Sequence, residues 1–278
     1  MKRRKRRVAI VGSGMVGATA AYSMINQSIC DEIMMVDRTY DRALAQALDL
    51  SHCIDFTHTR TSVYAGTYAD CSDMDVVILT AGANPKPGQT RLDVLEEAVL
   101  ITRQIVTPIL KSGFEGIFIT AANPVDIVTY LIRQLSGFPR NRVIGTGTSI
   151  DTSRKPVLDI LSQHKERFKH VDLTDIARKT KDAGWEIYTR KGSTHFGIGS
   201  AIAHITRSVL NDEHKIIAVS AILEGEYGEH GVCTGVPAII HSDGIQEIIE
   251  LNLNEEERGR FASSCGVIRS NLDKLNLV

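Results

Sequence analysis

The first half of the chain alternates short apolar runs with longer stretches in which apolar residues recur at helical spacing. The short runs predict strands at Arg7–Val11, Glu32–Asp37, Ser62–Ala65, Asp75–Thr80, Gly116–Ala121 and Arg142–Gly145. The longer stretches predict helices at Met15–Gln27, Arg38–Leu50, Leu92–Ser112 and Pro124–Gly137. Several runs are apolar at almost every position, as expected for strands that are covered on both faces. This alternation predicts an α/β fold with a doubly wound parallel sheet.

The pattern changes after about Asp151. Helices are predicted at Leu173–Arg190 and His195–Leu210, and strands at Ile216–Leu223, Gly235–Ile240 and Ile245–Leu253, with a turn over Glu224–Gly231. The last predicted helix begins after Asn254, a good N-cap residue. Its apolar face comprises Phe261, Cys265, Ile268, Leu272 and Leu275. We therefore expect two domains, an α/β domain over residues 1–146 and a smaller α+β domain over residues 147–278.

Composition and charge exclude few classes of protein. The chain has 43% hydrophobic and 23% charged residues and a formal net charge of -1, so it has no overall attraction for nucleic acid or anionic membrane. Lys2 to Arg7 form a polybasic arm, for which a solvated tail is favoured over contact with RNA or lipid. No apolar run reaches transmembrane length. We expect neither nucleic acid nor membrane as a partner.

The N-terminus also imitates a signal peptide, because an apolar stretch, Val8–Ile25, follows the basic arm. We reject that reading, since removal of this stretch would take away the first strand and a glycine motif. The five cysteines are scattered and contain no C-x-x-C pair. They fit buried thiols in a reducing compartment, so we expect a cytoplasmic protein without a disulfide framework or a metal site.

A glycine-rich loop, Gly12-Ser13-Gly14-Met15-Val16-Gly17, links the first predicted strand to the first predicted helix. Gly12 permits a tight turn, Gly14 lets the backbone approach a pyrophosphate, and Gly17 allows close packing of helix on strand. The helix N-terminus presents free amides to the anion. Asp37 ends the second predicted strand, where a carboxylate accepts ribose hydroxyls and repels a 2′-phosphate; its alternative role is a helix N-cap. A Rossmann-type domain that binds NAD is therefore predicted.

A second loop, Gly82 to Arg91, follows the strand Asp75–Thr80 at the sheet edge where such folds bind ligands. Its prolines and glycines and its terminal arginine suggest a lid that delivers a cation on closure. Taken alone, Arg91 is equally well explained as a surface residue.

Further motifs extend this pattern. ANPVD follows the strand Gly116–Ala121, and GTGTSIDTSR begins at Gly145. Together with the glycine loop and TAGANPKPGQTRLD, they resemble the lactate/malate dehydrogenase family, in particular its L-lactate branch. The resemblance covers residues 7–154 and resumes from Lys155, with KGST at Lys191–Thr194 and GEYGEHG and GVPAII within Gly225–Ile240.

The resemblance implies roles for individual residues. Arg91 would polarise the substrate carbonyl, Arg154 would grip the substrate carboxylate with a two-pronged donor, and Asp151 would orient a catalytic histidine. Asn123 would bond the substrate oxygen and Thr194 would line the pocket. Positions around the dinucleotide are matched by Gly12, Gly14, Met15, Val16, Gly17, Asp37, Arg42, Tyr68, Gly82, Ala83, Gln104, Ala122, Asn123 and Thr146.

Pro85 stands where malate-specific relatives present an arginine and lactate enzymes a glutamine. Without the second cation, a small 2-hydroxy or 2-oxo monocarboxylic acid such as lactate or pyruvate is favoured over a dicarboxylate. The resemblance further implies a homo-oligomer, a dimer or tetramer, of glycolysis and fermentation.

The family's catalytic histidine lies in a G-E-H-G-D motif several dozen residues after the arginine that Arg154 matches. Here Arg154 is followed directly by Lys155 and Pro156, which resemble the family only beyond that motif. The basic residues of the family's fructose-1,6-bisphosphate site are absent with it. Either the native polypeptide carries a segment that the printed sequence lacks, or the chain is truly shortened. We favour the first, because a deletion would remove strands and leave Asp151 without its imidazole.

Other histidines do not replace the missing one. Gly228-Glu229-His230-Gly231 spells part of the lost motif, but it falls in the predicted turn and lacks the following acid. His195 adjoins Thr194, yet neighbouring residues on a helix point about 100° apart, so a packing or surface role is favoured. His52 and His58 are interpreted as loop residues.

The resemblance thus implies an NAD-dependent L-lactate dehydrogenase. The alternatives are a catalytically impaired NAD-binding member of the same family and a dehydrogenase for malate or another 2-hydroxy acid. Nucleic-acid binding through the basic arm ranks behind all three.

Overall fold

In the computed structural model, residues 4–82, 95–147, 183, 184 and 186–275 are described. Their strands form one nine-stranded sheet with the order β3-β2-β1-β4-β5-β6-β7-β8-β9. The strands β1 to β6 are all parallel, whereas β6–β7, β7–β8 and β8–β9 are antiparallel pairs. The strands are β1 (Arg7–Val11), β2 (Glu32–Val36), β3 (Ser62–Ala65), β4 (Val76–Leu79), β5 (Ile117–Thr120), β6 (Val143–Gly145), β7 (Lys215–Glu224), β8 (His230–His241) and β9 (Gly244–Ile248).

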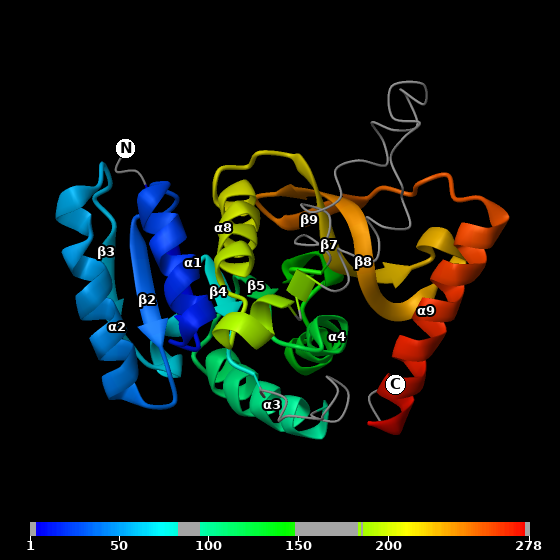
Figure 1. Cartoon of the computed structure of the whole chain (residues 1–278), viewed down its shortest axis with the longest axis horizontal. Helices are drawn as coiled ribbons and strands as arrows, with labels where there is room; N and C mark the ends of the chain where they lie inside the picture. Colours follow the sequence, from blue (N-terminus) through cyan, green and yellow to red (C-terminus); the bar gives the residue numbers. More distant parts are fainter. Residues whose placement is uncertain (1–3, 83–94, 148–182, 185, 276–278) are drawn as a thin grey trace.

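The helices cover both faces of the parallel part of the sheet (Figure 1). They are α1 (Met15–Asn26), α2 (Tyr40–His52), α3 (Leu95–Lys111), α4 (Val125–Ser136), α8 (Phe196–Leu210) and α9 (Glu255–Lys274). The predicted strands and helices of the first half are thus confirmed, with ends that differ by at most three residues. The predicted helix Leu173–Arg190 falls largely outside the described residues.

Alternating side chains along each strand divide the core into two layers. On β1, Val8 and Ile10 belong to a cluster with buried residues of α1, α2 and α8. Ala9 and Val11 face the opposite way and join buried residues of α3 and α4. Because both layers are apolar, the central strands are buried on both faces, as their continuous apolar sequence predicts.

The C-terminal strands continue the parallel sheet, a connection that the sequence pattern does not predict. Gly145 on β6 pairs with Ser220 on β7, and a Cβ on Gly145 would lie only 2.7 Å from the Ser220 Cβ. Glycine therefore allows β7 to approach the edge of β6. The boundary at residues 146 and 147 stays a prediction.

The last helix behaves as predicted. The Asn254 side chain accepts the Glu257 backbone N–H at 2.9 Å, while the Glu257 carboxylate accepts the Asn254 N–H, also at 2.9 Å. Such a reciprocal pair satisfies two amides that the helix leaves unpaired. Cys265 and Leu272 are buried, and Phe261, Ile268 and Leu275 are half-buried, so the predicted face packs against the core.

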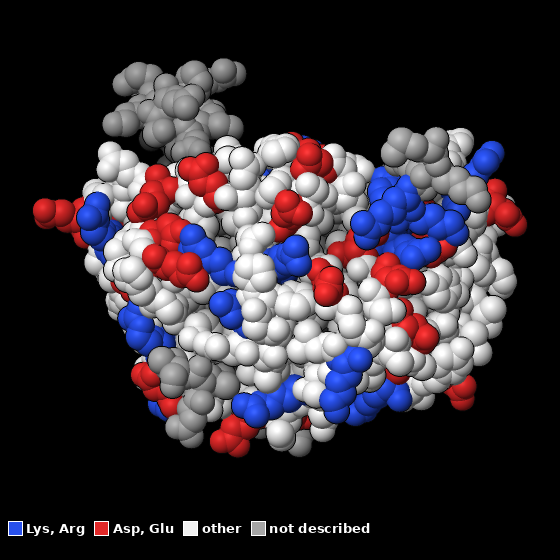
Figure 2. Space-filling model, turned by 180° about the vertical axis from the view of Figure 1, so that it is seen from behind, with Lys and Arg blue, Asp and Glu red and all other residues white. Residues whose placement is uncertain are grey.

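Two interpretations of the sequence need correction. His52 is the last residue of α2 and not a loop residue. The basic arm is not a free tail over residues 4–7, because Arg4 pairs with Asp75 at 2.9 Å and Arg6 with Asp31 at 3.3 Å. Over the face seen in Figure 2, Lys and Arg side chains are interspersed with Asp and Glu. Among the helices that the structure describes, none has the length and apolarity needed to cross a membrane.

Candidate functional site

The glycine loop joins β1 to α1 at the carboxyl edge of the sheet. Gly12 has φ +105°, a conformation that L side chains rarely adopt, and its N–H donates to the Val36 carbonyl at 2.8 Å. A Cβ on Gly17 would overlap the Gly12 carbonyl oxygen, which also accepts the Thr80 hydroxyl at 2.8 Å. Backbone and side-chain bonds from β2 and β4 thus hold the loop, and only glycine fits at positions 12 and 17.

In the first turn of α1, no carboxylate of the protein occupies the place of a bound anion. Gly14 is the N-cap residue and makes no side-chain cap bond, and the first turn contains no acidic residue. Met15 is 58% exposed, so it does not cover the helix end. Uncapped amides at a helix N-terminus, together with the helix dipole, favour a phosphate group.

Asp37 lies beside this loop, as predicted. One carboxylate oxygen accepts the Ser13 N–H at 2.9 Å and the other accepts the Thr39 N–H at 3.1 Å. Thr39, not Asp37, is the N-cap residue of α2, so the alternative role for Asp37 is wrong. A carboxylate has about four lone-pair sites, so acceptor capacity remains for two hydroxyl groups.

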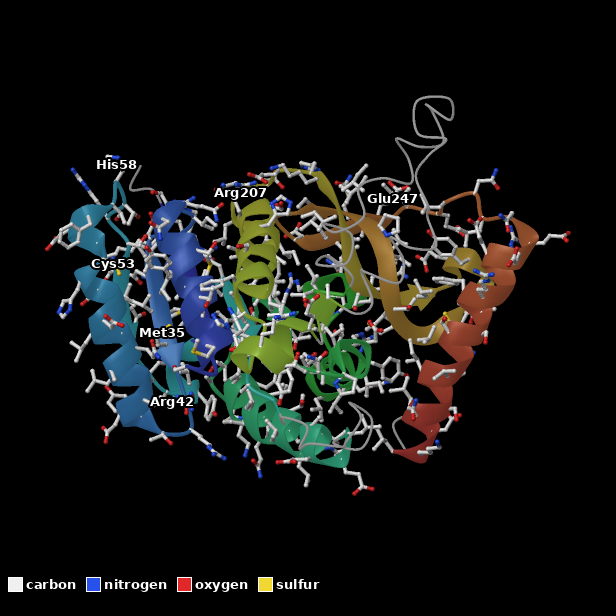
Figure 3. The ribbon with its side chains drawn as sticks, in the orientation of Figure 1. Met35, Arg42, Cys53, His58, Arg207 and Glu247 are labelled. Carbon is white, nitrogen blue, oxygen red and sulfur yellow. The ribbon has the colours of Figure 1, made fainter. Side chains whose placement is uncertain are left out.

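Two neighbours complete this side of the site. A Cβ on Gly14 would lie 3.7 Å from an Arg42 guanidinium nitrogen, so this exposed arginine reaches the glycine loop. Figure 3 shows Arg42 and His58 at opposite edges of the molecule, which separates His58 from the loop. Burial, and then the Asp37 carboxylate, raises the pKa of Tyr68, so its hydroxyl stays protonated near Asp37.

The ends of β4 and β5 supply a second group of predicted residues. A Cβ on Gly82 would lie 3.4 Å from the Ala122 Cβ and 3.9 Å from the Asn123 nitrogen. Thr120 links this group to the next strand, because its hydroxyl accepts the Ala122 N–H and its carbonyl accepts the Thr146 N–H. Asn123 is exposed, so its amide is open to a ligand.

Other predicted residues divide into two sets. Val16 on α1 is half-buried, Gln104 on α3 is exposed, and Thr194 is half-buried just before α8. The second set lies outside the described residues, as does the Arg154–Lys155 junction. It comprises Ala83, Pro85, Arg91, Asp151 and Arg154.

Of the packing and surface roles that the sequence favours for His195, the structure shows packing. It is 7% exposed and is the N-cap residue of α8. Its Nδ1 lies 3.0 Å from the Ser193 hydroxyl and its Nε2 lies 3.4 Å from the Lys191 ammonium. Burial, and then Lys191, lowers the pKa of His195, which fits a neutral ring bound within its own turn.

His230 lies at the start of β8, in the predicted turn between β7 and β8. It is exposed, and its carbonyl accepts a bond from Arg269 of α9 at 3.1 Å. These contacts belong to the hairpin and the last helix, in line with its rejection as the base.

Sequence reasoning missed a buried polar contact between α4 and β7. The Ser220 hydroxyl donates to the Asp126 carboxylate. Burial, and then the Asp126 charge, raises the pKa of Cys233 on β8. Burial raises the pKa of Asp126 despite the bond from Ser220. Asp126 belongs to the ANPVD segment, so the signal was present in the sequence, but its partner is remote along the chain.

Asp126→Asn is expected to change how stability depends on pH. The pKa of Asp126 in the folded protein is raised from its ordinary value of 3.8. The stability that the protonated carboxyl group contributes is therefore fully present below pH 3.8, and it is lost as pH rises through the pKa of the folded protein. The stability of Asp126→Asn relative to wild type should therefore increase from pH 4 to pH 8. Urea unfolding at a series of pH values measures this.

Ser220→Ala is the companion variant, because it removes the donor and keeps the carboxylate. It should cost about 1–3 kcal/mol, the usual penalty for a buried acceptor that loses its hydrogen-bond donor. A stability difference between Asp126→Asn and wild type that is the same at every pH would contradict this assignment.

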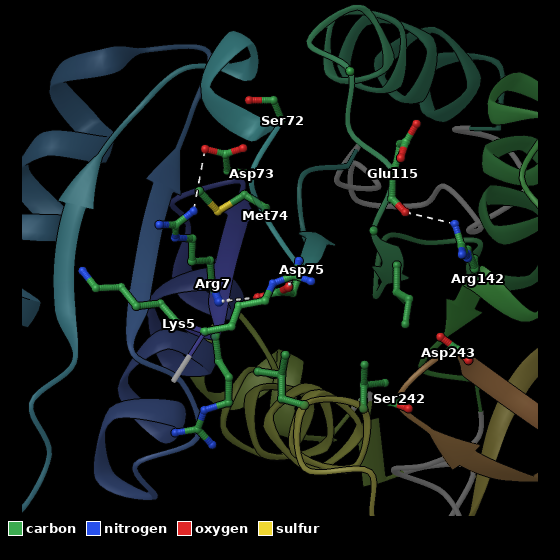
Figure 4. A pocket seen from close by; sticks show the side chains of 17 residues that line it. Lys5, Arg7, Ser72, Asp73, Met74, Asp75, Glu115, Arg142, Ser242 and Asp243 are labelled. Atoms are coloured by element: carbon green, nitrogen blue, oxygen red, sulfur yellow. Dashed lines mark hydrogen bonds and ion pairs between the residues drawn. The ribbon is translucent and has the colours of Figure 1, made fainter. Parts of the chain in front are cut away.

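A cavity of about 710 Å³ lies at the other edge of the sheet, among the amino ends of β1, β4, β5 and β6 (Figure 4). Its cations already have partners: the Arg4 guanidinium bonds Asp75, the Arg7 guanidinium pairs with Glu32 at 3.0 Å, and Arg142 donates to the Glu115 carbonyl. The glycine loop is not part of its lining. This cavity is therefore not the cofactor site.

Comparisons with known proteins identify the family. A family model described as lactate/malate dehydrogenase, NAD binding domain, matches residues 6–145, and the corresponding alpha/beta C-terminal domain matches residues 148–276. An L-lactate dehydrogenase 3 of Bacillus thuringiensis subsp. konkukian is 52% identical over 308 positions, with 97% of this chain and 98% of that protein covered.

Solved structures give the same result. A minor L-lactate dehydrogenase of Enterococcus mundtii, in a ligands-bound form, has a TM-score of 0.93 at 39% identity and covers 98% of this chain and 99% of its own. A malate dehydrogenase of Archaeoglobus fulgidus in complex with NADH has a TM-score of 0.87 at 29% identity, covering 97% of this chain and 99% of its own.

The length of the match also bears on the missing motif. It extends over 308 positions, whereas this chain has 278 residues, so at least 30 positions of the Bacillus protein have no counterpart here. Because 97% of this chain is covered, these positions lie inside the match and not beyond its ends. The sequence predicts that they follow Arg154.

Proposed function

Because the chain belongs to the lactate/malate dehydrogenase family, we propose that it is an NAD-dependent L-lactate dehydrogenase. The reaction moves a hydride reversibly between C2 of lactate and the nicotinamide ring, with pyruvate as the oxidised product. The observation that carries the proposal is the bond from the Ser13 amide to the Asp37 carboxylate. It sets a ribose acceptor beside a glycine loop whose helix end is uncapped.

The proposed cofactor contacts follow from this geometry. Amides at the front of α1 bind the pyrophosphate, and the free lone pairs of Asp37 accept the ribose hydroxyls. Gly82, Ala122, Asn123 and Thr146 line the far side, at the ends of β4, β5 and β6. A 2′-phosphate would meet the Asp37 charge, which favours NAD over NADP.

The proposed substrate contacts come from residues that the family resemblance assigns. Arg91 stabilises negative charge on the reacting oxygen, and Arg154 binds the carboxylate through two parallel bonds. Asn123 bonds the same oxygen as Arg91, and Thr194 contacts the substrate from the front of α8. In a polypeptide that carries the family's G-E-H-G-D segment, Asp151 orients the histidine that carries the hydroxyl proton.

The missing segment bears on the rate of the reaction rather than on cofactor binding. Each cofactor contact proposed above comes from residues that are present. Loss of a general acid and base costs about 10²–10⁴ in rate, so the 278-residue chain should bind NADH and turn over slowly. Intact mass of the native protein decides whether the segment is absent: the sequence predicts 30.5 kDa, and a larger mass shows that the polypeptide carries it.

The substrate assignment is tested by Pro85→Arg. A second cation on the lid should bind the distal carboxylate of oxaloacetate, and a charge-assisted bond contributes about 1.5–3 kcal/mol. We expect the ratio of kcat/KM for oxaloacetate to kcat/KM for pyruvate to rise by about 10- to 100-fold. Steady-state oxidation of NADH with each acid measures the ratio.

Pro87→Arg is the matched control, since it puts the same charge on the same loop at a different position. It should leave the ratio within about threefold of wild type. A wild-type protein that already prefers oxaloacetate would overturn the lactate assignment in favour of malate.

We also propose a homo-oligomer, a dimer or tetramer, in the cytoplasm, with a role in glycolysis and fermentation. An apolar stripe on α2 supports association: Tyr40, Leu44 and Leu48 recur at four-residue spacing and are 38–54% exposed. The five cysteines are free, and four of them are buried, which fits a reducing compartment.

A further inference from the structure

Two turns carry a group of metal-ligand side chains at the edge of the sheet opposite the glycine loop. Asp212 and His214 lie in the turn between α8 and β7, and His241 ends β8 just before the turn to β9. The two turns lie side by side (Figure 1), and the Ser242 N–H donates to Asp212 at 2.9 Å. Figure 3 shows Arg207 and Glu247, from the elements that flank these turns, at the edge away from Arg42.

The ligand atoms have the spacing of a small coordination sphere. Asp212 Oδ1 lies 3.4 Å from His214 Nε2 and 3.9 Å from His241 Nδ1, and one ligand atom from each residue lies within 4.8 Å of the others. Zinc bonds of about 2.0–2.1 Å in a tetrahedron put ligand atoms about 3.4 Å apart. Small side-chain rotations therefore suffice to close the three donors around one ion.

The second nitrogen of His214 determines which atom faces Asp212. His214 Nδ1 lies 2.6 Å from the Gln246 amide oxygen, which only accepts, so Nδ1 carries the proton. In the neutral ring, Nε2 then presents a lone pair to the Asp212 carboxylate. Two acceptors facing each other at 3.4 Å need a cation between them, either a proton or a metal ion.

The same bond is the outer contact that metal-binding histidines usually make. A ligating imidazole donates its other N–H to a carboxylate or carbonyl oxygen, which fixes the tautomer and the ring orientation. Gln246 on β9 supplies that oxygen here. The Ser242 N–H holds the carboxylate of Asp212 in the same way.

The backbone around the cluster is fixed and its nearby cations are engaged. Asp212 and His214 have φ of +54° and +51°, and the Asn141 amide donates to the Asp243 carbonyl at 2.7 Å, which anchors the other turn. Lys215 and Arg207 both pair with Glu213, at 2.9 and 3.2 Å. Their charges are thereby balanced beside the cluster.

We propose that Asp212, His214 and His241 bind a divalent transition-metal ion, with Zn²⁺ as the best fit and water as the remaining ligand. Two imidazoles and one carboxylate suit Zn²⁺, Cu²⁺ or Ni²⁺, whereas Mg²⁺ and Ca²⁺ prefer oxygen donors only. The ion links the α8–β7 turn to the β8–β9 turn and stabilises the C-terminal strands. It lies away from the proposed cofactor and substrate contacts, so it acts on stability and not on hydride transfer.

Equilibrium dialysis of the full chain against ZnCl₂ tests the proposal, with thermal unfolding as a second readout. Wild type should bind one Zn²⁺ per chain and unfold at a higher temperature with Zn²⁺ than with a chelator. His214→Asn and Asp212→Asn should abolish both effects, and both variants should fold because asparagine tolerates positive φ. His58→Ala, which removes an exposed histidine elsewhere, should bind Zn²⁺ like wild type.

Variants of Gln246 distinguish a metal site from a simple ion pair. Gln246→Ala should weaken Zn²⁺ binding by about 10- to 100-fold, and Gln246→Glu should restore it, because a carboxylate also accepts the His214 N–H. Absence of bound Zn²⁺, or binding by His214→Asn that equals that of wild type, would overturn the proposal. The second outcome would mean that the ion binds to other histidines or thiols.

Discussion

Gly17→Ala is expected to raise the Kd for NADH by about 10- to 100-fold. The added methyl group overlaps the Gly12 carbonyl oxygen and lies 2.9 Å from the Thr80 hydroxyl. Neither atom moves freely, because the Gly12 N–H is bonded to Val36 and the Gly12 carbonyl to Thr80. Overpacking of this kind costs about 1–3 kcal/mol, and here it displaces the amides that face the pyrophosphate. A fluorescence titration with NADH measures the loss.

Gly259→Ala is the matched control for this substitution. Gly259 lies in α9, and nothing lies within 4 Å of a Cβ added there. Alanine should raise helix stability by up to about 1 kcal/mol and leave the NADH affinity unchanged. If Gly17→Ala bound NADH as tightly as Gly259→Ala, the loop would not contact the dinucleotide.

The second large effect concerns the segment after Arg154. Inserting a segment that carries the family's G-E-H-G-D motif between Arg154 and Lys155 should raise kcat with pyruvate by about 10²–10⁴. The affinity for NADH should change by less than about threefold, because the proposed cofactor contacts lie outside the insertion. Stopped-flow oxidation of NADH and an NADH titration on the same preparations separate the two effects.

A second insertion, with the motif histidine replaced by asparagine, controls for restored folding. It should restore thermal stability as well as the first insertion does, yet leave kcat near that of the 278-residue chain. Equal turnover by the two insertions would mean that the histidine is not the general base. Fast turnover by the uninserted 278-residue chain would mean that another group already performs this role.

The sequence predicts the first half of the fold well for a physical reason. Its central strands, such as Val76–Leu79, are buried on both faces, so they appear as continuous apolar runs between helices of clear periodicity. The glycine loop and Asp37 are predictable too, because their chemistry depends on residues near in sequence to the strands that position them. The structure confirms their proximity through the Ser13–Asp37 bond.

What the sequence does not predict depends on contacts between distant segments. The antiparallel pairing of β7 with β6 depends on the close contact of Gly145 with Ser220. The buried carboxylate of Asp126 accepts its hydrogen bond from the same Ser220, which lies on β7. The group of Asp212, His214 and His241 has no motif spacing, since two turns bring it together only after β7 to β9 have paired. Periodicity reports which face a residue takes, not which remote residue it meets.

The central claim is that the amides of α1 and the carboxylate of Asp37 together bind a dinucleotide that carries no 2′-phosphate. Parallel titrations of the purified chain with NADH and NADPH, followed by nicotinamide fluorescence, test it most directly. NADH should bind at least about 100-fold more tightly, because the second phosphate group of NADPH meets the Asp37 charge at a cost of several kcal/mol. Equal affinities for the two, or no binding of NADH, would contradict the account.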